Sequence, residues 1–250
     1  EEIKISIKNK NNTNILEFKE KFLNIYKYFS EKDKFELEYR KYLAKRLFRN
    51  SSMIKETELE FLNILQNESG NIYVKKIKNM IKDIYHSQDL NKEFNDKIGR
   101  KRDQIDFIVK IVQLDEWPLE GINLKNNRVR SCRDIAALQT INLPHVVDKC
   151  VTEFTNFYYE KFKNRQIVWI HEFSWAELTF KKRDRNYALL VSSIQMAILF
   201  HFNIKRSYYI KEILYLIGIN KSDTDRFEMF TSYLIPLIKS NLLFSNRSFQ

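Results

Sequence analysis

Glycine and proline are scarce in this chain, with four and three occurrences among 250 residues. An average protein carries these two residues at roughly 12 % together, because tight turns and sheet ends depend on them. A collagen-like chain, a linker-rich chain and a turn-dense all-β chain are therefore excluded. Long helices need few such residues, so we expect a mainly helical protein. Hydrophobic residues make up 44 % of the chain, which is too apolar for disorder despite 30 % charged residues.

A 3.6-residue hydrophobic period runs through residues 15–98. Gly70 is expected to cap one helix at its C-terminus, and Ser87 to begin a short helix that carries Leu90 and Phe94. Short loops make successive amphipathic helices bury their apolar stripes on one another, so residues 1–98 are predicted to form a helical bundle. The other predicted helices span residues 15–29, 35–47, 59–65 and 74–84.

The pattern changes near Gly99. Residues 105–112 alternate in a way that is typical of a strand with two partly apolar faces, and Trp117-Pro118 ends it. One helix among several strands predicts an α/β subdomain over residues 99–186. Its other predicted parts are a polar loop insertion at 119–142, a helix at 143–158, and strands at 166–171 and 174–180.

Residues 187–250 are predicted to form a strand at 187–191 followed by helices at 193–202, 207–216 and 222–234. Gly218 lies just past the second of these helices, and Pro236 is expected to break or kink the third. Such a compact unit is typical of winged-helix folds. The predicted fold class is therefore mainly α with a smaller α/β part: helical bundle, α/β subdomain with a small sheet, then a winged-helix-like unit.

Residues 186–204 carry no formal charge and have to be considered as a membrane span. Their serine, asparagine, glutamine and histidine side chains disfavour burial in lipid. We expect a buried strand and helix here, and no membrane partner.

Motifs for catalysis are missing from the sequence. It contains no phosphate-binding glycine loop and no nucleophile elbow. The four histidines lack the spacing of a local metal site, and neither Cys132 nor Cys150 stands in a zinc motif. We therefore expect no enzyme, no metal site and no cofactor. Two lone cysteines favour a reducing compartment, the cytoplasm or nucleus.

The net charge of +11 favours an acidic partner. Three basic clusters lie near the ends of predicted strands. If these strands share a sheet, the clusters converge into one positive surface; otherwise each is an ordinary solvated loop. The clusters are Lys97, Arg100, Lys101 and Arg102; Lys161, Lys163 and Arg165; and Lys181, Lys182, Arg183 and Arg185.

Nucleic acid is the other acidic partner to consider. A winged helix that reads DNA needs a basic third helix. Residues 222–240 carry three acidic side chains (Asp223, Asp225 and Glu228) against two basic ones (Arg226 and Lys239), a net charge of 2 − 3 = −1. This helix is poorly suited to a phosphate backbone, so nucleic acid is the less favoured partner.

Seven segments between residues 28 and 245 resemble, in the same order, the C-terminal region of the cullin family. Their most specific stretches are Lys32-Asp33-Lys34-Phe35, Leu43-Ala44-Lys45-Arg46-Leu47, Asp83-Ile84 with Ser87-Gln88-Asp89-Leu90-Asn91, Trp117-Pro118, Leu143-Pro144, Val168-Trp169 with Ala176-Glu177-Leu178, and Gln195-Met196-Ala197-Ile198-Leu199.

This resemblance implies a non-catalytic scaffold of a cullin-RING ubiquitin ligase, acting in ubiquitin-dependent protein degradation. In that family a RING-box subunit, which carries the zinc, adds a strand to the cullin sheet. The three basic clusters would recruit a ubiquitin-conjugating enzyme, and substrate adaptors would bind through a helical stalk outside this chain. The residues expected to bind the RING-box strand are Ile105, Phe107, Val109, Ile111, Trp117, Val168, Trp169 and Ile170.

Some features depart from the family pattern. The insertion at 119–142 is longer than usual, and only Arg165 remains of the usual His-x-Gly-Arg. The resemblance ends with the first winged-helix unit, so we assign no modified lysine. The cullin-like subunit of the anaphase-promoting complex also fits, although Lys45-Arg46 and residues 195–199 favour an ordinary cullin. A basic winged-helix nucleic-acid-binding protein is the alternative from another class.

Overall fold

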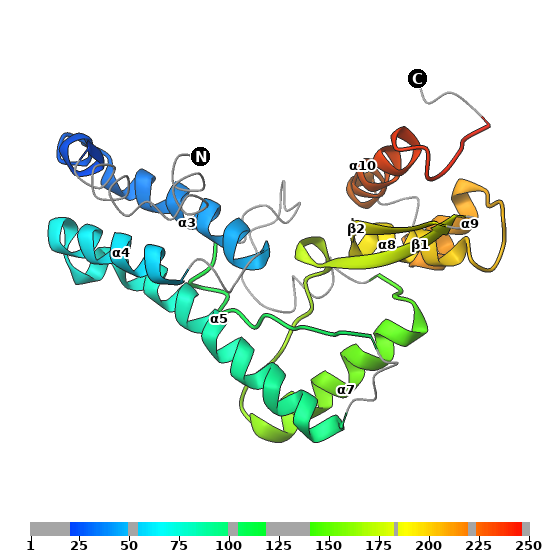
Figure 1. Ribbon diagram of the computed structural model, residues 1–250, viewed down its shortest axis with the longest axis horizontal. Coiled ribbons are helices and arrows are strands. Elements are labelled where there is room, and N and C mark those ends of the chain that lie inside the picture. The colour runs from blue at the N-terminus through cyan, green and yellow to red at the C-terminus, as the bar shows by residue number, and fades with distance from the viewer. Residues whose placement is uncertain are drawn as a thin grey trace. The chain divides into compact units, whose positions relative to one another are not determined.

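The computed structural model describes residues 21–49, 55–99, 105–118, 141–182, 185–219 and 224–246 (Figure 1). The chain divides into two compact units. Unit 1 comprises Glu1–Lys97 and Ile108–Leu119, and unit 2 comprises Ile98–Phe107 and Glu120–Gln250.

Unit 1 is built from helices. Residues 21–26 are helical and are followed by α3 (Lys32–Arg49), α4 (Lys55–Ser69) and α5 (Asn71–Ile98). The helices predicted at 35–47 and 59–65 are confirmed as α3 and α4. Gly70, the single residue between α4 and α5, has φ +89° and donates its N–H to the Gln66 carbonyl, which confirms it as a C-terminal cap.

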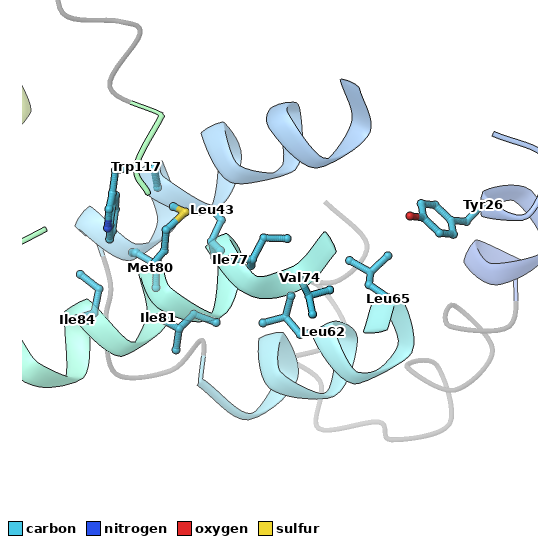
Figure 2. Packing of buried hydrophobic residues seen from close by; sticks show 12 residues of the cluster. Tyr26, Leu43, Leu62, Leu65, Val74, Ile77, Met80, Ile81, Ile84 and Trp117 are labelled. Carbon is cyan, nitrogen blue, oxygen red and sulfur yellow. The ribbon is translucent and has the colours of Figure 1, made fainter. Parts of the chain in front are cut away.

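The core of unit 1 forms where the apolar stripes of these helices meet (Figure 2). Leu43 of α3, Leu62 of α4 and Ile77 of α5 are fully buried. Between α3 and α4, Glu58 accepts hydrogen bonds from both Tyr39 and Arg46. The predicted packing of amphipathic helices is therefore present in this unit.

Helix α5 corrects one prediction. The sequence pattern predicts one helix that ends at residue 84 and another that begins at Ser87, whereas α5 runs unbroken for 28 residues. Ser87 is 2 % exposed and lies in the middle of the helix. Its hydroxyl accepts a hydrogen bond from the backbone of the extended segment that follows α5. In the sequence, a serine with this role cannot be told from an N-cap serine.

Unit 2 holds the only sheet of the described residues, an antiparallel hairpin. Its strands are β1 (Trp175–Lys182) and β2 (Arg185–Ser192), paired from Trp175–Ser192 to Lys182–Arg185. This hairpin confirms the strands predicted at 174–180 and 187–191. The helices of the unit are α7 (His145–Lys161), η1 (His171–Phe173), α8 (Ser193–His201), α9 (Ile210–Ile217) and α10 (Thr224–Lys239).

Two other predicted strands are wrong as sheet members. Residues 105–112 and 166–171 pair with no strand in the part of the chain that the structure describes. Both segments instead form hydrogen bonds with side chains of helices, of α5 in unit 1 and of α7 in unit 2. Alternating apolar residues indicate an extended backbone, but they do not indicate what pairs with it.

The last three helices bury a second core around Ile198, Ile217 and Phe230. Ser192 caps α8 by accepting from the Gln195 N–H, while the Gln195 side chain accepts from the Ser192 N–H. The winged-helix character of this region stays a prediction. No helix of the described residues is long and apolar enough to cross a membrane.

The expected end of the last helix is also corrected, because α10 continues past Pro236 to Lys239. Proline removes only one backbone donor. Near the end of a helix this loss interrupts little, since few turns follow.

We predict that Gly218→Ala destabilises the protein by about 1–2 kcal/mol through left-handed strain, and by more than Gly70→Ala does, because only at Gly218 would the added Cβ also crowd a neighbouring side chain. Gly218 ends α9 with φ +79°, and an added Cβ would lie 3.2 Å from the Asn142 side chain. Denaturant unfolding measures the change. Gly70→Ala is the matched control, with φ +89° and no atom within 4 Å of the added Cβ. An equal loss in both variants would contradict the role of the Asn142 contact.

Candidate strand-docking site

Three polar side chains, Asp83, Ser87 and Asn91, follow one another at four-residue intervals along α5. All three are buried, with 6 %, 2 % and 8 % of their surface exposed. Residues four apart lie on the same face of a helix, and this face otherwise carries apolar core residues. Buried polar groups are costly unless they are hydrogen-bonded, so their partners explain why they are there.

Asn91 pairs with Val109 through two hydrogen bonds. Its Nδ2 donates to the Val109 carbonyl at 2.6 Å, and the Val109 N–H donates to its Oδ1 at 2.8 Å. A neighbouring β-strand would exchange the same two bonds with Val109. The amide side chain therefore takes the place of a strand.

Ser87 binds Ile111, the next residue whose backbone groups face α5. The Ile111 N–H donates to Ser87 Oγ at 2.8 Å. The serine hydroxyl lies 2.7 Å from the Asp83 carbonyl and 3.1 Å from the Ile111 carbonyl, and it can donate its one hydrogen to either. Ile111 is thus held on the edge where Val109 is held.

Asp83 binds the end of the segment with both carboxylate oxygens. The Gln113 N–H donates to Oδ2 and the Gln113 side chain to Oδ1, each at 3.0 Å. The Trp117 indole also donates to Oδ2, at 2.9 Å. Three donors satisfy this buried carboxylate, all of them from residues 113–117.

The spacing of these contacts shows that residues 109–113 are extended. Four residues of an α-helix rise about 6 Å, and two residues of a strand advance about 6.6 Å. Alternate residues of the segment therefore match successive turns of α5. No strand of the described residues pairs with this stretch of chain, which follows α5 in Figure 1.

The opposite edge of the segment has no such partners. Neighbouring residues of an extended chain direct their N–H and C=O groups to opposite sides, so Ile108, Lys110 and Val112 face away from the polar face of α5. Their backbone groups form no hydrogen bond within the part of the chain that the structure describes. Ile108 is 74 % exposed. Unit 1 thus presents an unpaired strand edge.

Two side chains secure the segment to the helices. Lys110 donates to the carbonyls of Leu47 and Phe48 near the end of α3, at 2.8 and 2.6 Å, and its burial lowers the pKa of the amine. Trp117 is 3 % exposed and packs on Phe48, with 4.9 Å between ring centroids. Figure 2 shows it within the core cluster, beside Met80. Trp117 is therefore an anchor rather than a surface for a partner.

In unit 2, Phe107 and Trp169 are brought together. Their ring centroids lie 6.0 Å apart, and Phe154 of α7 packs against both. The Trp169 indole donates to Thr155 at 3.1 Å. Val168 and Ile170 on either side of Trp169 are half-buried, and Ile105 is 40 % exposed. Of the predicted contact residues, Val109, Ile111 and Trp117 belong to unit 1 and the others to unit 2.

The basic clusters are partly described. Lys161 at the end of α7 and Lys163 and Arg165 after it are exposed, with the Arg165 guanidinium 4.6 Å from the Phe162 ring centroid. Lys181 and Arg185 are exposed at the end of the hairpin, and Lys97 is exposed near the end of α5. Their predicted convergence into one surface assumed that the neighbouring strands share a sheet, and among the described residues they do not; the convergence itself stays a prediction. Arg100, Lys101, Arg102, Arg183 and the side chain of Lys182 lie outside the described residues.

Within the described ranges, no three His, Cys, Asp or Glu side chains are placed to hold a metal ion. The sequence analysis missed the role of Asp83, Ser87 and Asn91. The signal that could have found it is their four-residue spacing on the buried face of an otherwise apolar helix.

Comparisons with known proteins agree with this architecture. The family model of the cullin alpha+beta domain matches residues 111–244, and that of the cullin alpha solenoid domain matches residues 1–91. The solenoid match was not expected, because the sequence analysis placed the helical stalk outside this chain.

Similar proteins include Cullin-3 of Schizosaccharomyces pombe, 30 % identical over 209 residues, which cover 82 % of this chain and 25 % of the relative. Cullin-1 of Caenorhabditis elegans is 27 % identical over 201 residues, 79 % of this chain and 24 % of the relative. The chain thus spans about a quarter of the length of these relatives.

We predict that Trp117→Phe lowers the free energy of unfolding by about 2 kcal/mol. Phenylalanine keeps most of the packing but removes a hydrogen bond to a buried carboxylate, and such charged bonds contribute about 1.5–3 kcal/mol. Trp175→Phe is the control, because Trp175 is 41 % exposed, and its expected change is within about 0.5 kcal/mol. Urea unfolding compares the two; equal losses would refute the anchoring role of the indole.

Proposed function

The chain belongs to the cullin family, and we propose that it forms part of the non-catalytic scaffold of a cullin-RING ubiquitin ligase. In this role it holds a RING-box subunit and brings a ubiquitin-conjugating enzyme close to it, in ubiquitin-dependent protein degradation in the cytoplasm and nucleus. Zinc belongs to the RING-box subunit. Adaptors and substrates bind elsewhere on the parent assembly.

The observation that carries the proposal is the unpaired edge of residues 108–112. An exposed strand edge is a template for pairing with another chain, and proteins normally cover it. An extended segment of the RING-box subunit would pair with the N–H and C=O groups of Ile108, Lys110 and Val112. The exposed Ile108 side chain would add apolar contact. Ile105, Phe107, Val168, Trp169 and Ile170 are the further contacts that we propose in unit 2.

The proposed enzyme-recruiting surface is made of the basic clusters. Solvent-exposed lysine and arginine side chains attract an acidic partner over a distance and raise its association rate. Salt screens this attraction over about 10 Å at 0.1 M. The exposed ends of α7 and of the hairpin supply such side chains, Lys161, Lys163, Arg165, Lys181 and Arg185.

A nucleic-acid-binding role is the weaker alternative. Helix α10 carries Asp225 and Glu228 against Arg226 and Lys239, so it offers no excess positive charge. Relatives with the names Cullin-1 and Cullin-3 favour an ordinary cullin over the cullin-like subunit of the anaphase-promoting complex. Co-expression with a RING-box protein separates the classes: a scaffold co-purifies with it, whereas a nucleic-acid binder carries nucleic acid and gives a raised absorbance ratio.

Ile108→Pro is expected to weaken binding of a RING-box protein by about two- to tenfold. Proline removes the backbone N–H at the unpaired edge, and one main-chain hydrogen bond contributes about 0.5–1.5 kcal/mol. Because the side chain is 74 % exposed, the fold of unit 1 should persist, as circular dichroism would show. Ile108→Ala, which keeps the N–H, is the control for the lost side chain. If proline and alanine weaken binding equally, the strand-pairing proposal fails.

Replacing Lys181, Lys182, Arg183 and Arg185 with glutamate is expected to slow ubiquitin transfer by the assembled ligase roughly tenfold at low salt. The difference from the wild type should shrink at high salt, and the RING-box subunit should stay bound. Glutamate at the four exposed residues Lys75, Lys76, Lys82 and Lys92 of α5 is a control that changes the net charge by the same amount. Unchanged transfer rates in the hairpin variant would end the proposed recruitment role.

A further inference from the structure

We propose that Asp83, Ser87 and Asn91 are positioning residues that replace a β-strand. In this view the polar face of α5 holds residues 109–113 extended before any partner binds and decides which edge of the segment is presented. These three residues do not touch the partner. The identity of that partner rests on the proposed function, whereas the positioning device itself does not.

The contacts between α5 and the segment repeat with a fixed pattern. Asn91, Ser87 and Asp83 bind Val109, Ile111 and Gln113 in turn, each through the backbone N–H. Three successive matches between a helix and a strand edge demand agreement in spacing, direction and register. A single polar contact would not define an extended conformation, but three in series do.

Contacts at both ends of the segment fix its register along α5. A shift of one residue would turn the backbone groups of Ile108 and Lys110 toward α5 and expose those of Val109 and Ile111. The Asn91 amide pairs with both backbone groups of Val109, at 2.6 and 2.8 Å. The Trp117 indole bound to Asp83 anchors the other end. These two contacts oppose a shift from opposite ends of the segment.

The polar side chains of α5 and the extended segment depend on each other for their hydrogen bonds. Without the segment, the buried Asn91 amide and Asp83 carboxylate would lose the donors and acceptors that offset their burial. Without these side chains, the backbone groups of residues 109–113 would be unpaired on both edges, and only Lys110 and Trp117 would hold the segment to the helices. A partner strand would then have to order the segment as it binds, which weakens binding.

The test is residue-resolved amide hydrogen exchange in the 250-residue chain without a partner. The expected pattern alternates: the amides of Val109, Ile111 and Gln113 are protected, and those of Ile108, Lys110 and Val112 exchange at least tenfold faster. Uniform protection, or no protection, across residues 108–113 would overturn the inference.

Two variants of Asn91 make the test specific. Asn91→Leu should speed exchange at the Val109 amide at least tenfold and weaken binding of a RING-box protein about tenfold, while the Ile77 amide in the first half of α5 changes less than threefold. Asn91→Asp keeps an acceptor for the Val109 N–H but turns a carboxylate oxygen toward the carbonyls of Ser87 and Val109, to which the amide donates, so exchange at Val109 should be at least as fast as in the leucine variant. Unchanged exchange at Val109 in both would refute the role of Asn91.

Two further variants exclude a merely structural effect. Ile77→Val shortens a fully buried core side chain of the same helix and should leave both the alternation and the affinity for the RING-box protein unchanged. Ser87→Thr keeps the hydroxyl and should retain protection at Ile111, which Ser87→Ala should lose. If Ile77→Val abolishes the alternation as Asn91→Leu does, the effect is one of general stability and the inference is wrong.

Adding a RING-box protein separates this inference from the proposed function. If both hold, the amides of Ile108, Lys110 and Val112 become protected in the complex. If these amides stay unprotected while the free chain still alternates, the RING-box proposal fails and the positioning device stands.

Discussion

Hydrogen bonds from the polar face of α5 hold the backbone of residues 109–113 and the Trp117 side chain. Asp83, Ser87 and Asn91 are buried in an apolar helix face, and each is satisfied by the segment that follows the helix in the sequence. Since a buried polar group without a partner costs about 1–3 kcal/mol, the helix and the segment stabilise each other's conformation. The extended segment is thus fixed by side chains, without a neighbouring strand.

Pairing by side chains on one edge leaves the other edge unused. In an ordinary sheet both edges of an inner strand are occupied by backbone, whereas here Ile108, Lys110 and Val112 keep their backbone groups unpaired among the described residues. Lys110 and Trp117 tie the same segment to the core of the helices. An extended segment that is already paired on one edge would suit the proposed scaffold, because a partner would not have to order it on binding.

Periodicity in the sequence predicted the regular elements well. The 3.6-residue pattern located α3 and α4, and the strands predicted at 174–180 and 187–191 form the hairpin. Gly70 and Gly218 were correctly predicted as helix ends because few residues other than glycine adopt a positive φ. The middle of α5 and the partners of residues 105–112 were not predicted. Ser87 has the features of an N-cap, and a local pattern cannot reveal that its hydroxyl pairs with Ile111, 24 residues away. The helix was also predicted to break at Pro236, but α10 continues to Lys239. The effect of a proline depends on how many turns of the helix follow it, which the local sequence does not show.

The most direct test of this account is an experimental structure of the chain bound to a RING-box protein. We predict that a strand of the partner lies beside residues 108–112, with main-chain hydrogen bonds of about 2.7–3.2 Å to the N–H and C=O of Lys110, and that Asn91 still pairs with Val109. A complex in which the RING-box protein binds elsewhere and the Lys110 edge stays empty, or in which Val109 leaves Asn91 to pair with the partner, would contradict it.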